Sequence, residues 1–221
     1  MGALLRSDVI HRIDDAGRRK LAELGVSRVV DLRSDHEIDA APNLVDGLGI
    51  SVHRVPVFDR AAPTAQIPQD ITVGALHRHI VDERRPRLVE AIRLIPDVPD
   101  DGSVVVHCTA GKDRTGLVVA LVLAAAGVAR GDVVSDYALT EGHLRGAWAD
   151  AMLAAIAAKG FELTPGLIEM VTASPASVMD EVLADLEAAH GTVAGDLRAN
   201  GLSEAELSAL TTSIVAGPDP G

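Results

Sequence analysis

The sequence predicts an α/β fold, in which helices flank a parallel sheet and a helical extension follows at the C-terminal end. Over about the first 130 residues, short apolar runs alternate with helix-like segments and turns, an order typical of parallel sheets. Beyond that point the pattern is helical almost to the end. We predict a single domain over residues 1–216, large enough for a sizeable core, and a disordered tail at 217–221.

The first elements carry clear start and stop signals. A helix is expected at about 15–24, because Asp14 offers an N-cap and Gly25 a stop. Three runs rich in valine, isoleucine and leucine are typical of buried strands, and they lie at 26–32, 50–57 and 104–106.

A polar loop and a helical region connect the second predicted strand to the third. The loop covers 59–71, and the helical region covers about 72–95 with an interruption at Pro86. A further helix is predicted at 114–126. The remaining helices are expected at about 130–138, 141–159, 164–172, 176–190 and 203–215. The alanine-rich part of this series, about 141–172, suits either a lid over the site or plain core packing.

The net charge of −12 is unevenly distributed along the chain. Residues 1–129 hold 16 basic and 18 acidic side chains, whereas residues 130–221 hold 4 basic and 14 acidic ones. A nucleic-acid-binding surface needs a basic stripe, so we expect no nucleic-acid partner. The most apolar run, 116–128, is too short to span a bilayer. Because no secretory leader is evident, we predict a cytoplasmic protein without stable membrane insertion, and leave leaderless export open.

Cysteine and histidine usage argues against a metal centre. Cys108 is the only cysteine, so neither an intrachain disulfide nor a cysteine-rich metal site can form. The 8 histidines show no metal-ligand spacing. We therefore expect neither a metal nor a cofactor.

The chemistry is concentrated in the ten residues 107–116, which read His-Cys-Thr-Ala-Gly-Lys-Asp-Arg-Thr-Gly. They follow a strand and open a helix, which directs backbone N–H groups and the positive end of the helix dipole toward one point. Such a nest binds phosphate oxygens, and Gly111 allows the tight turn. The predicted phosphate-binding residues are Thr109, Ala110, Gly111, Lys112, Asp113 and Arg114.

Two side chains give this loop its expected reactivity. Cys108 stands at its base, and Arg114 follows six residues later at the start of the helix. A free thiol has a pKa of ~8.5, which helix N-termini and cations lower to roughly 3.5–7.5. Cys108 is therefore predicted to be a thiolate nucleophile, and the planar fork of Arg114 to hold two phosphoryl oxygens through the transition state. Thr115 is expected to donate its hydroxyl to the thiolate, and His107 to fix the loop.

Two other interpretations fit the loop less well. A nucleotide-binding P-loop needs Gly five residues before Gly111 and Ser or Thr after Lys112, where this sequence has Val106 and Asp113. A structural strand–turn–helix with one buried cysteine explains Cys108 alone. It does not explain why arginine, threonine and glycine stand at the same fixed spacing.

The spacing of Cys108, Arg114 and Thr115 resembles the signature of cysteine-dependent tyrosine and dual-specificity phosphatases. The full ten-residue string is similar to that of the bacterial atypical tyrosine phosphatases, and it also resembles the loop of lipid phosphatases. Further segments that match the family are 5–7, 30–34 with Glu37, 55–59, Asp136-Tyr137 and 183–210. The resemblance implies hydrolysis of phosphomonoesters through a phosphocysteine intermediate. Protein phosphotyrosine is then the first expected substrate and phosphoinositides the second, and some members of the family also act on phosphoserine and phosphothreonine.

The resemblance also implies roles for individual residues. It makes Cys108 the nucleophile, Arg114 the phosphate clamp and Lys112 an extra cation at the loop rim, although a plain solvated lysine is the alternative there. Two residues are candidates for the general acid. We favour Asp113, within the loop, over Asp59, which follows the second strand.

Two further expectations concern the ends and the edge of the sheet. Arg33 and Glu37 are expected to form an ion pair that braces a strand end. The family usually carries an additional N-terminal segment with an Asn-x-Arg-Asp pattern, and this sequence begins almost where that segment would end. An edge without such cover would expose Leu4 and Leu5, which predicts a homodimer. The alternative is that the acidic C-terminal helices fold back over the edge and keep the protein monomeric.

A catalytically silent phosphate-binding module that recognises phosphorylated partners is the alternative function. It requires loss of the nucleophile, the clamp or the acid, and all three residue types are present. The expected partner is therefore a substrate, either a phosphorylated protein or a phosphoinositide.

Overall fold

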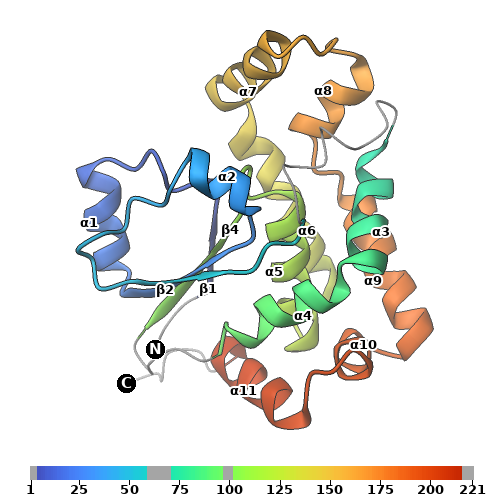
Figure 1. Cartoon of the computed structure of the whole chain (residues 1–221). Coiled ribbons are helices and arrows are strands. Elements are labelled where there is room, and N and C mark those ends of the chain that lie inside the picture. Colours follow the sequence, from blue (N-terminus) through green and yellow to red (C-terminus); the bar gives the residue numbers. More distant parts are fainter. Residues whose placement is uncertain (1–3, 59–70, 97–101, 216–221) are drawn as a thin grey trace.

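The computed structural model describes residues 4–58, 71–96 and 102–215, and it confirms the α/β class (Figure 1). The helices of this part of the chain are α1 Asp15–Glu23, α2 Asp35–Ala40, α3 Val73–Glu83, α4 Arg85–Arg93, α5 Asp113–Ala125, α6 Arg130–Leu144, α7 Ala147–Ala158, α8 Pro165–Thr172, α9 Ala176–His190, α10 Val193–Ala199 and α11 Glu204–Val215. Asp59 and the predicted tail at 217–221 lie outside the described residues.

One sheet of four parallel strands organises the molecule, in the order β1-β4-β2-β3. The strands are β1 Leu4–Ser7, β2 Val26–Asp31, β3 Ser51–Arg54 and β4 Ser103–His107. Because all of them run the same way, their carboxyl ends meet at one edge of the sheet. At that edge His107 is paired with Ser7 on one side and with Asp31 on the other. Ligands of parallel α/β sheets bind outside this edge.

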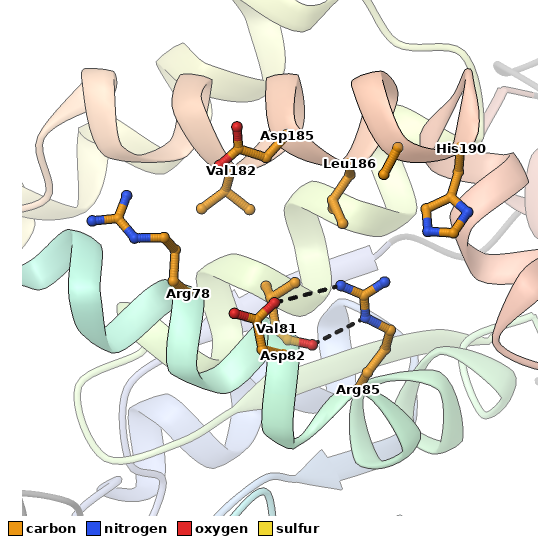
Figure 2. A pocket seen from close by; sticks show the side chains of 9 residues that line it. Arg78, Val81, Asp82, Arg85, Val182, Asp185, Leu186 and His190 are labelled. Carbon is orange, nitrogen blue, oxygen red and sulfur yellow. Dashed lines mark hydrogen bonds and ion pairs between the residues drawn. The ribbon is translucent and has the colours of Figure 1, made fainter.

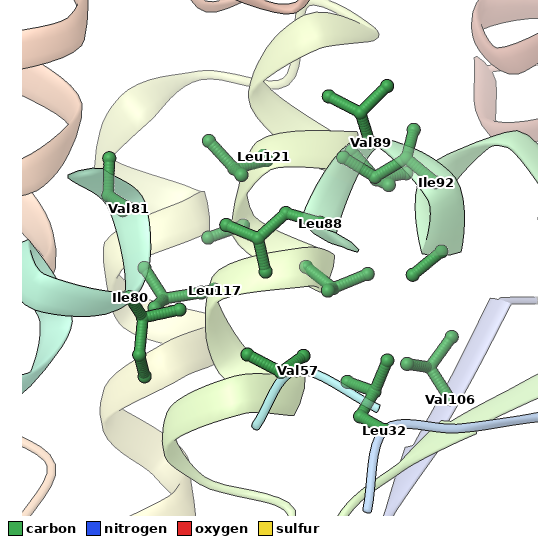
Figure 3. Close-up of a cluster of buried hydrophobic side chains, with 14 of the residues drawn as sticks. Leu32, Val57, Ile80, Val81, Leu88, Val89, Ile92, Val106, Leu117 and Leu121 are labelled. Atoms are coloured by element: carbon green, nitrogen blue, oxygen red, sulfur yellow. The ribbon is translucent and has the colours of Figure 1, made fainter. Parts of the chain in front are cut away.

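Valine side chains alternate between the two faces of the central strands. Val30 and Val106 belong to the larger hydrophobic core, whereas Val29 and Val105 belong to the smaller one. The larger core lies between the sheet and helices α3–α6 and α9–α11, and Figure 3 shows Leu117 and its neighbours within it. The smaller core lies between the other face and α1. Both faces of the sheet are thus covered, as parallel sheets require.

Helix α5 forms the axis of the larger core. Its residues 114–122 are all buried, so it is apolar on every side, as the run at 116–128 predicts. Among the described residues, no helix is long and apolar enough to cross a membrane. Burial on all sides fixes the position of α5, and with it the loop that precedes its first turn.

Several local signals act as the sequence predicts. The Asp14 side chain accepts a hydrogen bond from the Gly17 backbone N–H at 2.9 Å and caps α1. Pro86 lies in the first turn of α4, where its missing N–H costs no helical hydrogen bond. The region at 72–95 is therefore two helices with a break before the proline.

The C-terminal helices differ from the prediction in two places. Helix α6 continues through residues 139–144, because buried Thr140 and Leu144 hold this segment against the body of the protein. Helix α10 was not predicted. The Thr192 hydroxyl caps it, and Val193 and Leu197 are buried, so packing and capping outweigh the low helix propensity of its Gly and Asp residues.

Strand β1 forms one edge of the sheet. Leu4 packs against the larger core and Leu5 against the smaller one, and both are half-buried. The expectation that these two leucines lie without cover is therefore wrong. The homodimer stays a prediction, and it no longer has exposed leucines as its support.

Helices α7 and α8 pack against each other and stand apart from the sheet, at the top of Figure 1. Only Ala149 is buried in α7, whereas α8 buries Met170 and Val171. Plain core packing therefore does not describe α7. A lid formed by this segment stays a prediction.

Candidate active site

The loop between β4 and α5 is held tightly against the end of β1. Gly111 has a φ of +66°, and a Cβ placed on it would lie 2.5 Å from the Ser7 carbonyl oxygen. The Val9 N–H donates a hydrogen bond to the Thr109 carbonyl oxygen at 3.3 Å. Glycine is thus required at position 111 both by the backbone conformation and by the close approach of the neighbouring strand.

Cys108 is a free cysteine at the base of the loop, and only 2% of its surface is exposed. The fully buried His107 beside it has its Nδ1 3.0 Å from the Cys108 carbonyl oxygen, the geometry of a donated N–H. Burial lowers the pKa of His107, although the nearby Asp31 carboxylate opposes that shift. A neutral imidazole bonded to the loop backbone suits a residue that fixes the loop.

Arg114 is held by a carboxylate that the sequence did not assign to it. Its Nη1 and Nη2 donate to the two oxygens of Glu37 at 2.9 and 3.0 Å, and Thr109 Oγ1 donates to the same carboxylate. The guanidinium also lies over the ring of Phe58, 5.7 Å from its centroid. This bidentate pair fixes the plane of the arginine fork beside the loop.

The Arg114 pair keeps Glu37 ionised. Burial by itself would raise the pKa of Glu37, but the hydrogen bonds and charge of Arg114, together with Thr109 and Ser34, outweigh it and lower the pKa to about 2. Glu37 also closes a capping box with Ser34 at the start of α2. The capping box places this carboxylate at the carboxyl edge of the sheet, facing the loop.

The expected ion pair between Arg33 and Glu37 is therefore wrong. Arg33 instead pairs with Asp31, with 2.8 Å between Nη2 and Oδ2, and it donates to Asn43 Oδ1 at 2.9 Å. Burial would raise the pKa of Asp31, but the Arg33 hydrogen bonds outweigh it and lower the pKa. Arg33 is 1% exposed, and its Nη1 donates to the carbonyl oxygen of Ala41 at 2.9 Å, so it contacts the C-cap of α2 and not Glu37 in the first turn of that helix.

Lys112 does not lie at an open rim, and that part of the expectation is wrong. Its side chain is 1% exposed, and its Nζ donates to the Met170 carbonyl oxygen and, at 2.9 Å, to the Ala173 carbonyl oxygen. These carbonyls belong to the C-terminal end of α8, where the helix dipole favours a cation. Lys112 thus ties the loop to α8.

Asp113 is the first residue of α5. Of its two carboxylate oxygens, Oδ1 is the inner one, which faces the protein interior, and Oδ2 is the outer one. Oδ1 is buried, 3.4 Å from Lys112 Nζ and 3.9 Å from Nδ1 of His77. The side chain as a whole is 21% exposed, which comes from its other atoms. Asp59, the other candidate acid, lies outside the described residues.

The remaining loop residues line the same site. Thr109 and Ala110 are half-buried, and the fully buried hydroxyl of Thr115 has no hydrogen-bond partner among the described residues. A cleft of about 440 Å³ opens beside Ala110 and Gly111, between β1, α6 and α7. In its wall, Arg6 is held by Thr140 at 2.7 Å and by the Asp136 carboxylate at 3.3 Å.

A second, smaller groove of about 180 Å³ lies between α3 and α9 (Figure 2). Arg78, Arg85 and His190 line it together with acidic and aliphatic side chains. None of its lining residues belongs to the loop at 107–116. The candidate active site is therefore the loop and the cleft beside it.

A parallel α/β sheet with a Cys-x5-Arg loop at a helix N-terminus is the arrangement that the sequence predicts for a phosphatase. The sequence matches the tyrosine phosphatase family over residues 1–216, and the chain belongs to that family. It is therefore a phosphoric monoester hydrolase.

Two curated bacterial relatives are similar over nearly the whole chain. A tyrosine-protein phosphatase of Nostoc commune is 30% identical, over 96% of this chain and 74% of the relative. The triple specificity protein phosphatase PtpB of Mycobacterium tuberculosis is 32% identical, over 95% of this chain and 89% of the relative.

Sequence reasoning did not find three side chains that contact the candidate catalytic groups. Glu37 was noticed but given the wrong partner, although its place three residues after Ser34 signals a helix N-terminus at the sheet edge. His77 and Tyr137 approach Asp113 and the start of α5 from distant helices. Only the packing of α3 and α6 brings them there. No local pattern marks His77, and Tyr137 was noticed in the Asp136-Tyr137 match without being given a role.

Proposed function

We propose that the protein hydrolyses phosphomonoesters through a phosphocysteine on Cys108, with protein phosphotyrosine as its main substrate. The observation that carries this proposal is the meeting of three groups at the N-terminus of α5: the Cys108 thiol, the loop N–H groups and the Arg114 fork. No other described part of the chain combines a nucleophile with a phosphate-binding nest.

In the first step, the Cys108 thiolate attacks phosphorus and the bond from phosphorus to the leaving oxygen breaks. Asp113 gives its proton to that oxygen, so an alcohol or phenol departs and a phosphocysteine remains. In the second step, water attacks phosphorus and passes a proton to the Asp113 carboxylate. The S–P bond breaks, inorganic phosphate leaves, and Thr115 donates to the sulfur that regains its negative charge.

Arg114 stabilises both transition states. Glu37 accepts one N–H from each terminal nitrogen, while Nη1 also donates to the Leu32 carbonyl oxygen at 3.4 Å and Nη2 to Thr109 Oγ1 at 3.2 Å. Phosphoryl oxygens would replace these two longer contacts. Because Glu37 is itself fixed by Ser34 and Thr109, the fork is held in place before substrate binds. Glu37 is therefore proposed as the positioning residue of the clamp.

The substrate order rests on charge and on the relatives. The names of the two relatives are a tyrosine-protein phosphatase and a triple specificity protein phosphatase. Phosphoinositides carry several phosphates, whereas this protein has a net charge of −12 and Lys112 is already bound to α8. We therefore place phosphotyrosine first, phosphoserine and phosphothreonine second, and phosphoinositides third.

Hydrolysis of 4-nitrophenyl phosphate in the presence of EDTA tests the proposal. Turnover should persist, and Cys108→Ser should abolish it while phosphate binding is retained. Loss of activity on chelation alone would contradict the phosphocysteine route. Binding of phosphate without any turnover by the wild-type protein would instead support the silent binding module.

Relative rates on phosphopeptides and on a lipid substrate test the substrate order. Three substrates suffice: a phosphotyrosine peptide, its phosphoserine counterpart and a short-chain phosphoinositide. The proposal expects the highest kcat/KM for phosphotyrosine. A phosphoinositide preference would overturn the order without affecting the mechanism.

A further inference from the structure

A small buried polar cluster lies directly behind the carboxylate of Asp113. His77 reaches it from α3 and Tyr137 from α6, and the two rings meet edge to face with 5.5 Å between centroids. The Asp113 Oδ1 atom is 3.9 Å from His77 Nδ1 and 3.4 Å from Lys112 Nζ. Elements that are far apart in the sequence thus converge on one carboxylate oxygen.

Three polar atoms of this cluster are buried without hydrogen-bond partners among the described residues. They are His77 Nε2, the Tyr137 hydroxyl and Asp113 Oδ1. The His77 side chain has no solvent exposure and Tyr137 has 1%. Unpaired buried polar groups reduce stability, and their retention in native proteins calls for a functional explanation.

His77 faces Asp113 as a neutral imidazole. Its Nδ1 lies 2.9 Å from the Val73 carbonyl oxygen, so the ring N–H is donated within α3. Burial lowers the pKa of His77, and this outweighs the opposing influence of Asp113. The imidazole therefore excludes water from the inner carboxylate oxygen without forming an ion pair with it.

Tyr137 can approach the first turn of α5 closely because residue 116 is a glycine. A Cβ on Gly116 would lie 2.8 Å from Cδ2 of the Tyr137 ring, so only glycine lets the ring approach the first turn of α5 this closely. Burial raises the pKa of the Tyr137 hydroxyl, and the negative charge of the nearby Asp113 carboxylate raises it further. Tyr137 therefore stays protonated and neutral beside the acid.

We infer that His77 and Tyr137 are positioning residues for the general acid. They shield the inner side of the Asp113 carboxylate from water, and the positive charge of Lys112 lies 3.4 Å from Oδ1, so that Oδ2 carries the proton that passes to the leaving oxygen. The charged groups around this carboxylate are Lys112 in the loop and Arg114 in α5. The inference rests on the proposed function, in which Asp113 is the acid.

Two single substitutions test it, His77→Gln and Tyr137→Ala, which removes the shielding ring, with His79→Gln as the matched control. His79 is an exposed histidine on the same helix. The measured quantity is the ratio of kcat on phenyl phosphate, a poor leaving group, to kcat on 4-nitrophenyl phosphate, a better one. Both test variants should lower this ratio by roughly tenfold, a part of the 10²–10⁴-fold that a general acid contributes.

Repeating the substitutions in an Asp113→Asn background separates this inference from the proposed function. Asp113→Asn alone should lower the ratio strongly, and adding His77→Gln or Tyr137→Ala should lower it no further. If Asp113→Asn leaves the ratio unchanged, the proposed acid is wrong and the inference falls with it.

If Asp113→Asn acts as expected but His77→Gln and Tyr137→Ala behave like His79→Gln, the inference alone is overturned. Equal effects of the test variants with and without Asp113 would overturn it as well. Should Tyr137→Ala fail to fold, His77→Gln carries the test, because glutamine is close to histidine in volume.

Discussion

Arg114 binds two partners of opposite kinds: a carboxylate in the resting protein and, in the proposed mechanism, a phosphoryl group. Its fork is held by Glu37 in a bidentate pair, and Thr109 links that carboxylate back to the loop. A planar guanidinium accommodates both, because its five N–H donors point in fixed directions. The clamp is thus assembled before any substrate arrives.

Glu37→Gln should lower kcat/KM on aryl phosphates on the order of 10²-fold, because the new amide N–H groups face the Arg114 donors and the fork shifts. Asp35→Asn removes an exposed carboxylate from the same helix and should have little effect. Steady-state kinetics of both variants check this. An unchanged kcat/KM in Glu37→Gln would show that the clamp does not depend on this pair.

The same residue predicts a pH dependence of stability. The pKa of Glu37 is lowered from 4.5 to about 2, so its contribution to the free energy of unfolding is fully present above pH 4.5. That contribution is lost as the pH falls toward 2. The stability difference between wild type and Glu37→Gln should therefore narrow over this range, as urea titrations at several pH values would show. A constant difference would contradict the assigned cause of the shift.

The close approach of the Ser7 carbonyl to Gly111 can be tested by comparing alanine substitutions at Gly111 and Gly127. Gly111→Ala meets both a positive φ and the Ser7 carbonyl oxygen, whereas Gly127→Ala has a positive φ of +87° and nothing within 4 Å. Gly127→Ala should cost about 1 kcal/mol of stability and keep activity. Gly111→Ala should cost more, about 1–3 kcal/mol or above, and lose phosphate binding. Equal losses of activity in the two variants would rule out the close approach as the cause.

At the residue scale, the sequence predicts which side chains surround the phosphate but not how they pair. Cys108 and Arg114 are predictable because the loop is one continuous motif. The pairing of Arg33 is not, because Asp31 and Glu37 are both within its reach and only the backbone direction after β2 decides between them. Lys112 was misplaced for a similar reason: its partners are α8 carbonyls about sixty residues away.

At the scale of elements, Lys112 connects the loop at 107–116 to the C-terminal end of α8. Because its charge is bound to α8 carbonyls, we expect Lys112→Met to slow turnover of phosphotyrosine and of phosphoinositides to the same degree. It should also cost about 1–3 kcal/mol of stability, since buried carbonyls lose their donor. Lys159→Met, which removes the exposed lysine after α7, should change neither. Substrate-selective loss in Lys112→Met would mean that this lysine contacts the substrate.

Elements with an all-apolar pattern were predictable to within a residue or two. Strand β4 and helix α5 are buried on every side, so their hydrophobic runs coincide with their bounds. The end of α6 and the whole of α10 were not, because tertiary burial and a single cap define them. Helix α7 differs in the opposite way. Its alanine-rich sequence is compatible with core packing, but the helix buries only Ala149.

At the scale of the whole molecule, the net negative charge of the protein repels the anionic substrate that the loop is proposed to bind. The net charge is −12, and most of the excess lies beyond residue 129. For phosphotyrosine peptides with acidic flanking residues, kcat/KM should rise with added salt, because screening weakens the repulsion. Peptides with basic flanks should show the opposite slope. Identical salt slopes for both peptide sets would mean that the global field does not reach the site.

The central claim is that phosphate passes through Cys108, and trapping that intermediate tests it most directly. Wild-type enzyme mixed with an aryl phosphate and quenched in acid within milliseconds should carry phosphate on the peptide that contains Cys108, identified by mass spectrometry. The Cys108→Ser variant should carry none and should not turn over. Steady turnover with no phosphocysteine, or hydrolysis that survives Cys108→Ser, would contradict the account.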